Sequence, residues 1–119
     1  MAFPAIELER LQQEVGIDDV ELLVTVAQAL AKEAPICLEN IENALAERKE
    51  QDLAIAAHTL KGASRVMMMS SVAAVAQEVE MAGKRCDFEA VTTHLATLRH
   101  HVDEMLQAIE QFVNDNQAR

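Results

Sequence analysis

Apolar residues recur at steps of three and four over most of this chain, and that spacing constrains its fold most strongly. One stripe comprises Leu23, Ala27, Leu30, Ala34, Cys37, Ile41 and Leu45. A later stripe comprises Phe88, Val91, Leu95, Leu98, Val102, Met105, Ile109 and Phe112. Such spacing places apolar side chains on one face of an α-helix, whereas a half-buried strand alternates every second residue. The pattern predicts long amphipathic helices.

Capping residues and helix breakers indicate where these helices begin and end. The predicted ranges are about 5–14, 18–48, 52–68, 71–84 and, for the last helix, from residue 88 onward. Gly16 ends the first helix, and the sequence IDD at 17–19 caps the second. Ser70 and Ser71 cap the fourth helix and Asp87 caps the fifth. Pro35 lies inside the second range, so we expect a kink or a break beside it.

Four substantial helices with short connections predict an all-α fold, an antiparallel four-helix bundle with a short additional N-terminal helix. The polar sequence 47–51 connects two of the helices, and the polar sequence 114–119 is expected to be a frayed end. A chain of 119 residues without internal repeats is interpreted as one domain over 1–119. Because one bundle can bury the apolar stripes, we expect a monomer.

Composition limits the classes of function. The formal net charge of −10 argues against nucleic-acid binding and against binding to anionic membrane surfaces, since both need clustered Lys and Arg. No segment has the ~20 apolar residues of a membrane span, and the N-terminus does not resemble a signal peptide. Cys37 and Cys86 are far apart and are interpreted as buried thiols in a reducing compartment. We therefore expect a cytoplasmic protein.

The sequence HTLKGASR, residues 58–65, lies inside the third predicted helix and contains an unexpected glycine. Glycine in a helix costs roughly 1 kcal/mol relative to alanine, so a local reason for it is expected. At about 100° per residue, His58 points away from the core-facing stripe. That stripe comprises Leu53, Ala56, Leu60, Ala63 and Met67, with Ala57 and Ser64 at its edge. His58 is therefore predicted to point to solvent, with Lys61, Gly62 and Arg65 on the same outer face.

The residues around His58 predict an open, partly apolar surface. Ala54 and Gly62 lie one turn before and after it, and the aliphatic Ile55 lies beside it. Gly62 lacks the side chain that would shield the imidazole from a large partner, and this is our explanation for the glycine. The alternative is an ordinary surface histidine with an imperfect helix residue one turn later, and geometry alone does not separate the two.

The sequence AAHTLKGAS at 56–64 resembles the motif of the histidine-containing phosphotransfer (HPt) domain, commonly written A-H-x-L-K-G-x-[SA]. The resemblance covers nearly the whole chain, with DDVELL entering a long helix, AP within it and VAAVAQEVEMAGK after the motif. It implies an exposed histidine that carries a phosphoryl group between receiver domains. It assigns His58 as the phosphoacceptor, Lys61 as the lysine beside the phosphate and Gly62 as the small residue that permits docking.

The same resemblance implies the partners, which are receiver domains of hybrid histidine kinases and of response regulators. It implies no cofactor of the chain itself, because the receiver domain supplies the aspartate and Mg²⁺. The protein would then be a carrier and not an enzyme with its own catalytic machinery. Family members usually close the following helix hairpin with a glycine and a small residue. Met68 and Met69 stand there instead, which leaves the form of this turn open.

A hairpin turn near residue 69 places Glu80 opposite His58, because each lies about eleven residues from the turn. The resemblance also implies a hydrogen-bonding side chain at about Glu80, which would orient the ring nitrogen that is not phosphorylated. Lys84 and Arg65 would add positive charge near the phosphate. The expected docking residues are Ala54, Ile55, Gly62 and Gln77. For Gln77, Glu80 and Lys84 the alternative is a solvated surface residue.

Other features favour simpler interpretations. His94, His100 and His101 lack the spacing of a helical metal site, so we expect surface histidines and no metal. Met67 is interpreted as filling the core, although the run from Met67 to Met69, with Met81, could form an adaptable binding face.

Two competing functions stay open. One is the dimerising phosphoacceptor domain of a histidine kinase, which usually carries an acidic residue where Thr59 stands. The other is a structural helical adaptor in which His58 is incidental. The start at Met1 favours a free-standing protein over a segment of a hybrid kinase. The sequence predicts a phosphorelay carrier.

Overall fold

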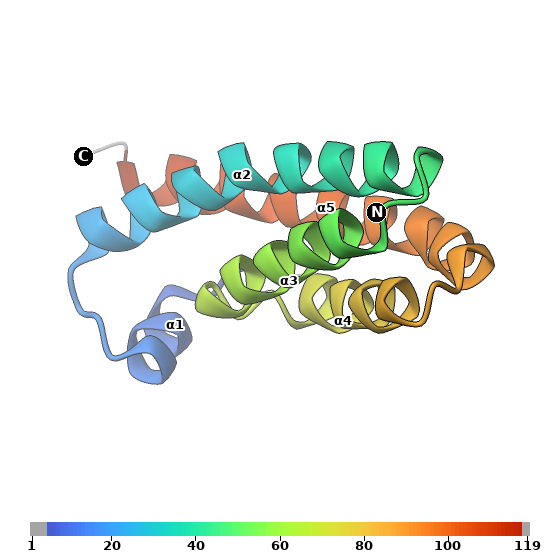
Figure 1. Cartoon of the computed structure of the whole chain (residues 1–119). Coiled ribbons are helices and arrows are strands. Elements are labelled where there is room, and N and C mark those ends of the chain that lie inside the picture. The colour runs from blue at the N-terminus through green and yellow to red at the C-terminus, as the bar shows by residue number, and fades with distance from the viewer. Residues whose placement is uncertain (1–4, 118–119) are drawn as a thin grey trace.

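Four antiparallel helices form a bundle, and a short fifth helix precedes them. The computed structural model describes residues 5–117. Its helices are α1 (Leu8–Val15), α2 (Val20–Ala46), α3 (Glu50–Val66), α4 (Ser70–Lys84) and α5 (Phe88–Gln117). Helix α2 packs on α3 and α5, and α4 packs on the same two helices. Figure 1 shows the pair α2 and α5 above the pair α3 and α4. The predicted four-helix bundle with an additional N-terminal helix is confirmed.

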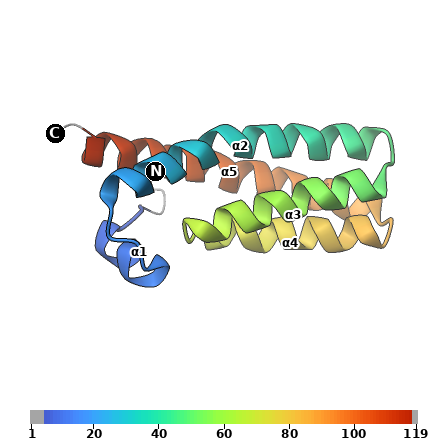
Figure 2. The same ribbon diagram turned by 60° about the vertical axis from the view of Figure 1, so that its left-hand side comes forward.

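The N-terminal helix lies at one end of this bundle. Helices α2 and α5 extend beyond the turn between α3 and α4, and α1 lies below that extension (Figures 1 and 2). Leu11 of α1 is buried there. Gly16 ends α1 in the left-handed conformation (φ 75°), and the Asp19 carboxylate caps α2 by accepting from two backbone N–H groups. Both predicted boundaries are confirmed, although α1 begins three residues later than expected.

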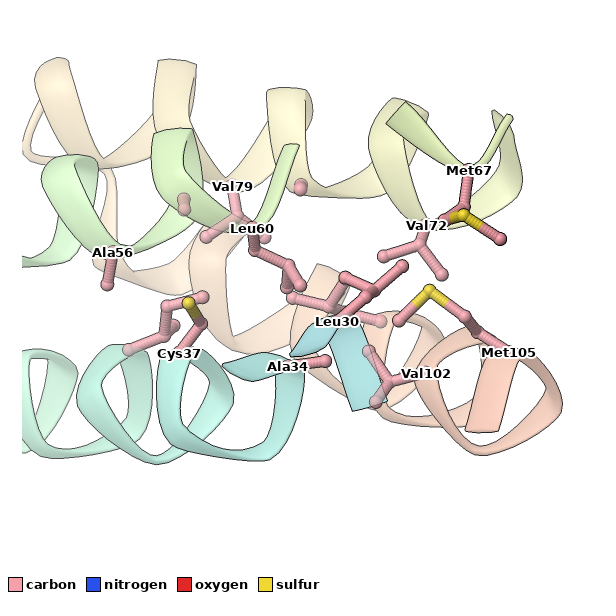
Figure 3. Packing of buried hydrophobic residues seen from close by; sticks show 14 of the residues in the cluster. Leu30, Ala34, Cys37, Ala56, Leu60, Met67, Val72, Val79, Val102 and Met105 are labelled. Atoms are coloured by element: carbon pink, nitrogen blue, oxygen red, sulfur yellow. The ribbon is translucent and has the colours of Figure 1, made fainter. Parts of the chain in front are cut away.

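The predicted apolar stripes form the core. In α2 the stripe is buried except for Leu45, and in α5 it is buried except for Phe88, which is partly exposed. Figure 3 shows Leu60 and Val79 pointing toward Cys37 and Leu30 between the helices. Met67 is only 1% exposed and fills the core near the turn between α3 and α4, as predicted.

Helix α2 continues through Pro35 without a break. Proline removes the N–H that would bond to the carbonyl group one turn earlier, which usually interrupts a helix. Here Ala34 and Cys37 on either side of Pro35 are both buried. Packing therefore holds the two halves of α2 in one helix, so the predicted break is wrong, while a kink at Pro35 stays a prediction.

The three tight turns between the bundle helices close by the same backbone pattern. Arg48, Met68 and Cys86 each adopt a left-handed conformation with φ between 57° and 59°. After α3, the Met69 N–H donates to the Ser64 carbonyl and the Met68 N–H donates to the Arg65 carbonyl. This is the Schellman arrangement, in which glycine usually takes the left-handed position. None of the three turns has a glycine at that position, so the usual sequence signal for this backbone arrangement was absent.

The start of α4 differs from the prediction for the same reason. Met69 is the N-cap residue and makes no side-chain hydrogen bond, while Ser70 and Ser71 are the first helical residues. The backbone closure at Met68 starts the helix one residue earlier than expected. The predicted serine cap is therefore wrong.

The C-terminal half contains two further corrections. Asp87 caps α5 as predicted, its carboxylate accepting from the Ala90 N–H at 3.1 Å. Helix α5 continues to Gln117, so the expected frayed end is wrong for 114–117, and 118–119 lie outside the described residues. Cys86 is exposed because it lies in the turn before α5, which corrects the prediction of two buried thiols. Cys37 is buried, and desolvation together with Glu33 raises its pKa to about 11.

Candidate functional site

His58 lies near the middle of α3 on its solvent-facing side. The side chain of His58 is 66% exposed. The opposite side of α3 contributes Leu53, Ala56, Ala57, Leu60 and Ser64 to the buried interior, while Ala63 is partly buried. Helical periodicity therefore predicted the direction of the imidazole correctly, because the direction depends only on the local helix.

A buried carboxylate on α4 contacts the imidazole. Helices α3 and α4 lie side by side and antiparallel (Figures 1 and 2). Glu80 Oε2 lies 3.0 Å from His58 Nδ1, and only 7% of the Glu80 side chain is exposed. The hairpin count thus located the neighbour of His58, and Glu80 is not a solvated surface residue.

Three donors share the Glu80 carboxylate. Lys61 Nζ donates to Oε1 at 2.6 Å, and Lys84 Nζ lies 3.1 Å from Oε2, which also meets His58. Burial opposes ionisation of Glu80, but the hydrogen bonds from Lys61 and Lys84 outweigh it and hold its pKa at about 2. The carboxylate is therefore ionised at neutral pH and can only accept hydrogen bonds.

The ionised carboxylate assigns the tautomer of the neutral imidazole. Because Glu80 can only accept, the proton of the ring is assigned to Nδ1, which donates to Oε2. The lone pair then lies on Nε2, the other ring nitrogen. The arrangement supplies a nucleophilic nitrogen on an exposed ring whose orientation is set by a buried group.

The cations near His58 differ in how firmly they are held. The Lys61 side chain is only 13% exposed, although periodicity placed it on the outer face, because it extends across to α4. The Lys84 side chain is 64% exposed. Arg65 is exposed and donates to Gln77 Oε1 at 3.2 Å, which forms a second polar bridge between α3 and α4. The structure thus gathers Lys61, Glu80 and Lys84 at His58 and places Arg65 and Gln77 in a separate pair.

The expected docking residues divide into exposed and covered positions. Ile55 is 64% exposed, and a side chain added at Gly62 would meet nothing within 4 Å. Ala54 is 9% exposed and not on the open surface, which corrects its predicted position. Helix α4 covers Ala54 at Gly83, where an added Cβ would lie 3.8 Å from the Ala54 backbone nitrogen.

Gly83 is the residue whose importance the sequence analysis missed. A Cβ at Gly83 would lie 2.6 Å from Leu53 Cδ2, so the glycine permits α4 to approach α3 closely. The sequence signal for this close approach was a pair of small residues, Ala54 on α3 and Gly83 on α4.

A shallow hollow lies beside the imidazole. Its lining residues are Ala54, Ile55, His58, Thr59, Glu80 and Lys84. The hollow is open to solvent, so it can be approached by another macromolecule, and the Lys84 side chain borders it. This arrangement fits a small anion attached to His58 better than an enclosed small-molecule substrate.

The remaining histidines lie elsewhere, on α5. His100 and His101 both contact the Glu104 carboxylate, at 3.4 and 3.1 Å. Within residues 5–117, no group of three or more His, Cys, Asp and Glu side chains is arranged to hold a metal ion. None of the helices described is long and apolar enough to cross a membrane.

The chain was compared with models of known protein families. The family model described as "Hpt domain" matches residues 25–112, which include the whole of α3 and α4 and most of α2 and α5. Neither the curated proteins nor the solved structures contain a match to the chain. The family match spans well over half of the 119 residues and includes the helix that carries His58. The chain belongs to the Hpt domain family.

Proposed function

We propose that this protein is a phosphorelay carrier that accepts a phosphoryl group on His58 from a receiver-domain aspartyl phosphate and passes it to another receiver domain. Membership of the Hpt family supports a phosphotransfer role in two-component signalling. The observation that carries the proposal is the 66% exposed imidazole whose Nδ1 meets the buried Glu80 carboxylate at 3.0 Å.

The chemistry requires little from the carrier itself. The Nε2 lone pair attacks phosphorus, the bond from phosphorus to the aspartate oxygen breaks, and the aspartate leaves as a carboxylate. Phosphoryl transfer depends mainly on positioning and on neutralising charge. The receiver domain provides the aspartate and Mg²⁺, while this chain provides a fixed imidazole and nearby ammonium groups. The protein is in this proposal a carrier and not an enzyme.

Each residue around His58 has a distinct proposed role. Glu80 orients the ring, and Lys61 and Lys84 contribute positive charge near the phosphoryl group. Arg65, held by Gln77, adds charge at the edge of the docking surface. Ile55 supplies an exposed apolar contact for the receiver domain. Gly62 leaves space for the receiver domain to reach the imidazole, and Ala54 lines the hollow beside His58. We also infer that the carrier acts as a monomer in the cytoplasm.

Transfer from a radiolabelled phosphorylated receiver domain tests the proposal. The wild-type protein should acquire an acid-labile, base-stable label, and His58→Gln should abolish that label. His94→Gln is the matched control, since His94 is a half-buried histidine on α5 and should leave labelling unchanged. Incubation with ATP alone should produce no label. Undiminished labelling of His58→Gln would eliminate His58 as the acceptor, and labelling by ATP would favour the kinase interpretation.

Gly62→Gln tests the proposed docking surface. The glutamine side chain would extend into the open space one turn from His58, where it would hinder the receiver domain. Transfer should slow by about 100-fold, because small displacements of reacting groups have effects of that size. Circular dichroism should show that the helical content is unchanged. Transfer at the wild-type rate would show that the glycine has no role in docking.

A further inference from the structure

One large apolar side chain on α4 is exposed beside the cluster around His58 and takes no part in it. Met81 is 45% exposed, although methionine side chains are most often buried. We propose that Met81 is an apolar anchor for the receiver domain, the counterpart on α4 of Ile55 on α3, and that its adaptable side chain serves the donor and the acceptor receiver alike. This inference rests on the proposed function and adds to it a residue that determines docking.

The position of Met81 on α4 follows from its neighbours one turn away. Gln77 precedes it and accepts a hydrogen bond from Arg65 of α3. Lys84 follows it and pairs with Glu80. At about 100° per residue, Gln77 and Lys84 lie within about 60° of Met81 around the helix. Met81 is therefore on the exposed face of α4 that borders α3.

The register of the hairpin brings Met81 level with the imidazole. Glu80 contacts His58 Nδ1 at 3.0 Å. Met81 is the next residue, so it differs from Glu80 by only about 1.5 Å along the helix axis. Helices α3 and α4 pack side by side (Figure 2), and the axes of packed helices are about 8–10 Å apart. Met81 thus lies across from His58, at a separation set mainly by the spacing of the two helices.

Ile55 lies on the other side of the imidazole. At about 100° per residue, Ile55 and Lys61 are about 120° apart around α3, with His58 between them. Lys61 extends to Glu80 of α4, so Ile55, which is 64% exposed, is on the side of His58 away from α4. Two exposed apolar side chains, one on each helix, therefore flank the proposed phosphoacceptor.

The size of a protein interface places Met81 beneath the receiver domain. Phosphoryl transfer requires the receiver aspartate to reach the imidazole, so the interface is centred near His58. A standard interface covers about 800 Å² on each partner, a disc of about 16 Å radius, and half that area still gives about 11 Å. Met81, on the neighbouring helix at the level of His58, lies within even the smaller disc. A receiver domain that reaches the ring therefore also covers Met81.

Methionine suits a surface that two different partners share. The proposed carrier docks one receiver to accept the phosphoryl group and another to pass it on. The unbranched, polarizable side chain of methionine can repack against surfaces of different shape. Met67 fills the core, and Met68 and Met69 are partly buried at the turn after α3. In this proposal Met81 alone supplies the adaptable contact.

Saturation kinetics of phosphoryl transfer test this inference. Labelling of His58 is followed at increasing concentrations of a phosphorylated donor receiver, and labelled protein is discharged to increasing concentrations of an unphosphorylated acceptor receiver. Met81→Ala should raise the half-saturating concentration of both receivers by about fivefold or more. The saturating rate should stay unchanged, because the variant removes a docking contact and no reacting group. Met81→Leu keeps an apolar side chain of similar volume and should restore most of the affinity.

Leu22→Ala is the matched control, because Leu22 is also 45% exposed but lies in the first turn of α2, outside the hairpin. It should leave both half-saturating concentrations unchanged. An increase below about twofold in Met81→Ala with either receiver would overturn the inference, and so would an equal increase in Leu22→Ala. A lower saturating rate in Met81→Ala, or an affinity of Met81→Leu as low as that of Met81→Ala, would also overturn it.

Nuclear magnetic resonance of the methionine methyl groups supplies a test that needs no variant. Irradiation of a bound receiver domain should transfer saturation to the methyl group of Met81, with the buried Met67 as the internal reference. No transfer to Met81 above that reference would overturn the inference. If wild type acquires no label on His58 at all, the proposed function fails and this inference fails with it. Normal labelling with unchanged half-saturating concentrations in Met81→Ala overturns only the inference.

Discussion

Glu80 is a charged residue in a buried position, and its partners explain why the fold tolerates it. Removing a carboxylate from water is costly unless hydrogen bonds and opposite charges replace the lost solvation. Here Lys61 and Lys84 contribute ammonium groups and His58 contributes a ring nitrogen. The same contacts that keep Glu80 ionised also fix the imidazole, so stability and the proposed function depend on one cluster.

The pH dependence of stability measures how strongly this cluster is held. The pKa of Glu80 is lowered from 4.5 to about 2 in the folded protein. A carboxylate with a lowered pKa stabilises the fold above its unfolded value and loses that effect as the pH falls toward the folded value. The stability difference between wild type and Glu80→Gln should therefore shrink by about 2 kcal/mol between pH 7 and pH 3.

Urea unfolding at both pH values gives that difference directly. Other carboxylates also titrate in this range, but they are common to both proteins and cancel in the comparison. Glu78→Gln, which changes an exposed residue, should show no such pH dependence. A stability difference between wild type and Glu80→Gln that is equal at pH 7 and pH 3 would contradict the lowered pKa.

At the scale of elements, the hairpin of α3 and α4 carries the whole cluster around His58. Its register is set by the Schellman turn at Met68 and by the close approach of the helices at Gly83. The two glycines of the hairpin are therefore present for different physical reasons. Gly83 is needed for packing, whereas Gly62 points into open space and is not needed for the fold.

Alanine at each glycine separates these two reasons. Gly62→Ala should stabilise the protein by about 0.5–1 kcal/mol, because alanine is the better helix former and its Cβ meets no atom. Gly83→Ala gains the same helix propensity but forces a Cβ to within 2.6 Å of the buried Leu53, so it should destabilise by about 1–2 kcal/mol. Thermal unfolding of the two variants gives the comparison. Equal effects at both positions would refute the proposed close packing at Gly83.

At the scale of the whole molecule, the bundle forms a rod of 47 × 29 × 19 Å. The turn between α3 and α4 lies toward the end where α1 is placed (Figure 2). His58 lies near the middle of α3, about two turns from that end of the helix. The proposed docking surface around His58 therefore lies on α3 and α4. The long helices α2 and α5 pack against α3 and α4, so the helix that carries the imidazole is held in the bundle.

Burial of the apolar stripes within the chain leads to a prediction of oligomeric state. The exposed large apolar side chains, Leu22, Ile36, Ile55, Val66 and Met81, are spread over α2, α3 and α4. Isolated exposed apolar residues are common on monomeric proteins. Light scattering coupled to size-exclusion chromatography should give a mass near 13.1 kDa at all concentrations. A mass near twice that value would contradict the proposed monomer.

The amino-acid sequence by itself determined the properties that depend on local geometry. Helical periodicity identified the buried stripes and the outward direction of His58, because the turn per residue does not depend on neighbouring helices. Gly16, Asp19 and Asp87 marked helix ends through side-chain and backbone chemistry within a few residues. The A-H-x-L-K-G motif indicated the family for the same reason, since it is a local pattern.

Tertiary structure alone decided the properties that depend on how closely and in what register the helices meet. Periodicity placed Lys61 and Ala54 on the outer face, yet α4 draws Lys61 inward and covers Ala54. Helix α2 is also continuous at Pro35, where local helix propensity alone predicts a break. Residue counting from the turn and the family resemblance both indicated Glu80 as the neighbour of His58, but its burial and its 3.0 Å contact with the ring come from the tertiary structure. The distance between two helices depends on side chains remote in the chain, such as Leu53 and Gly83, and local patterns contain no measure of that distance.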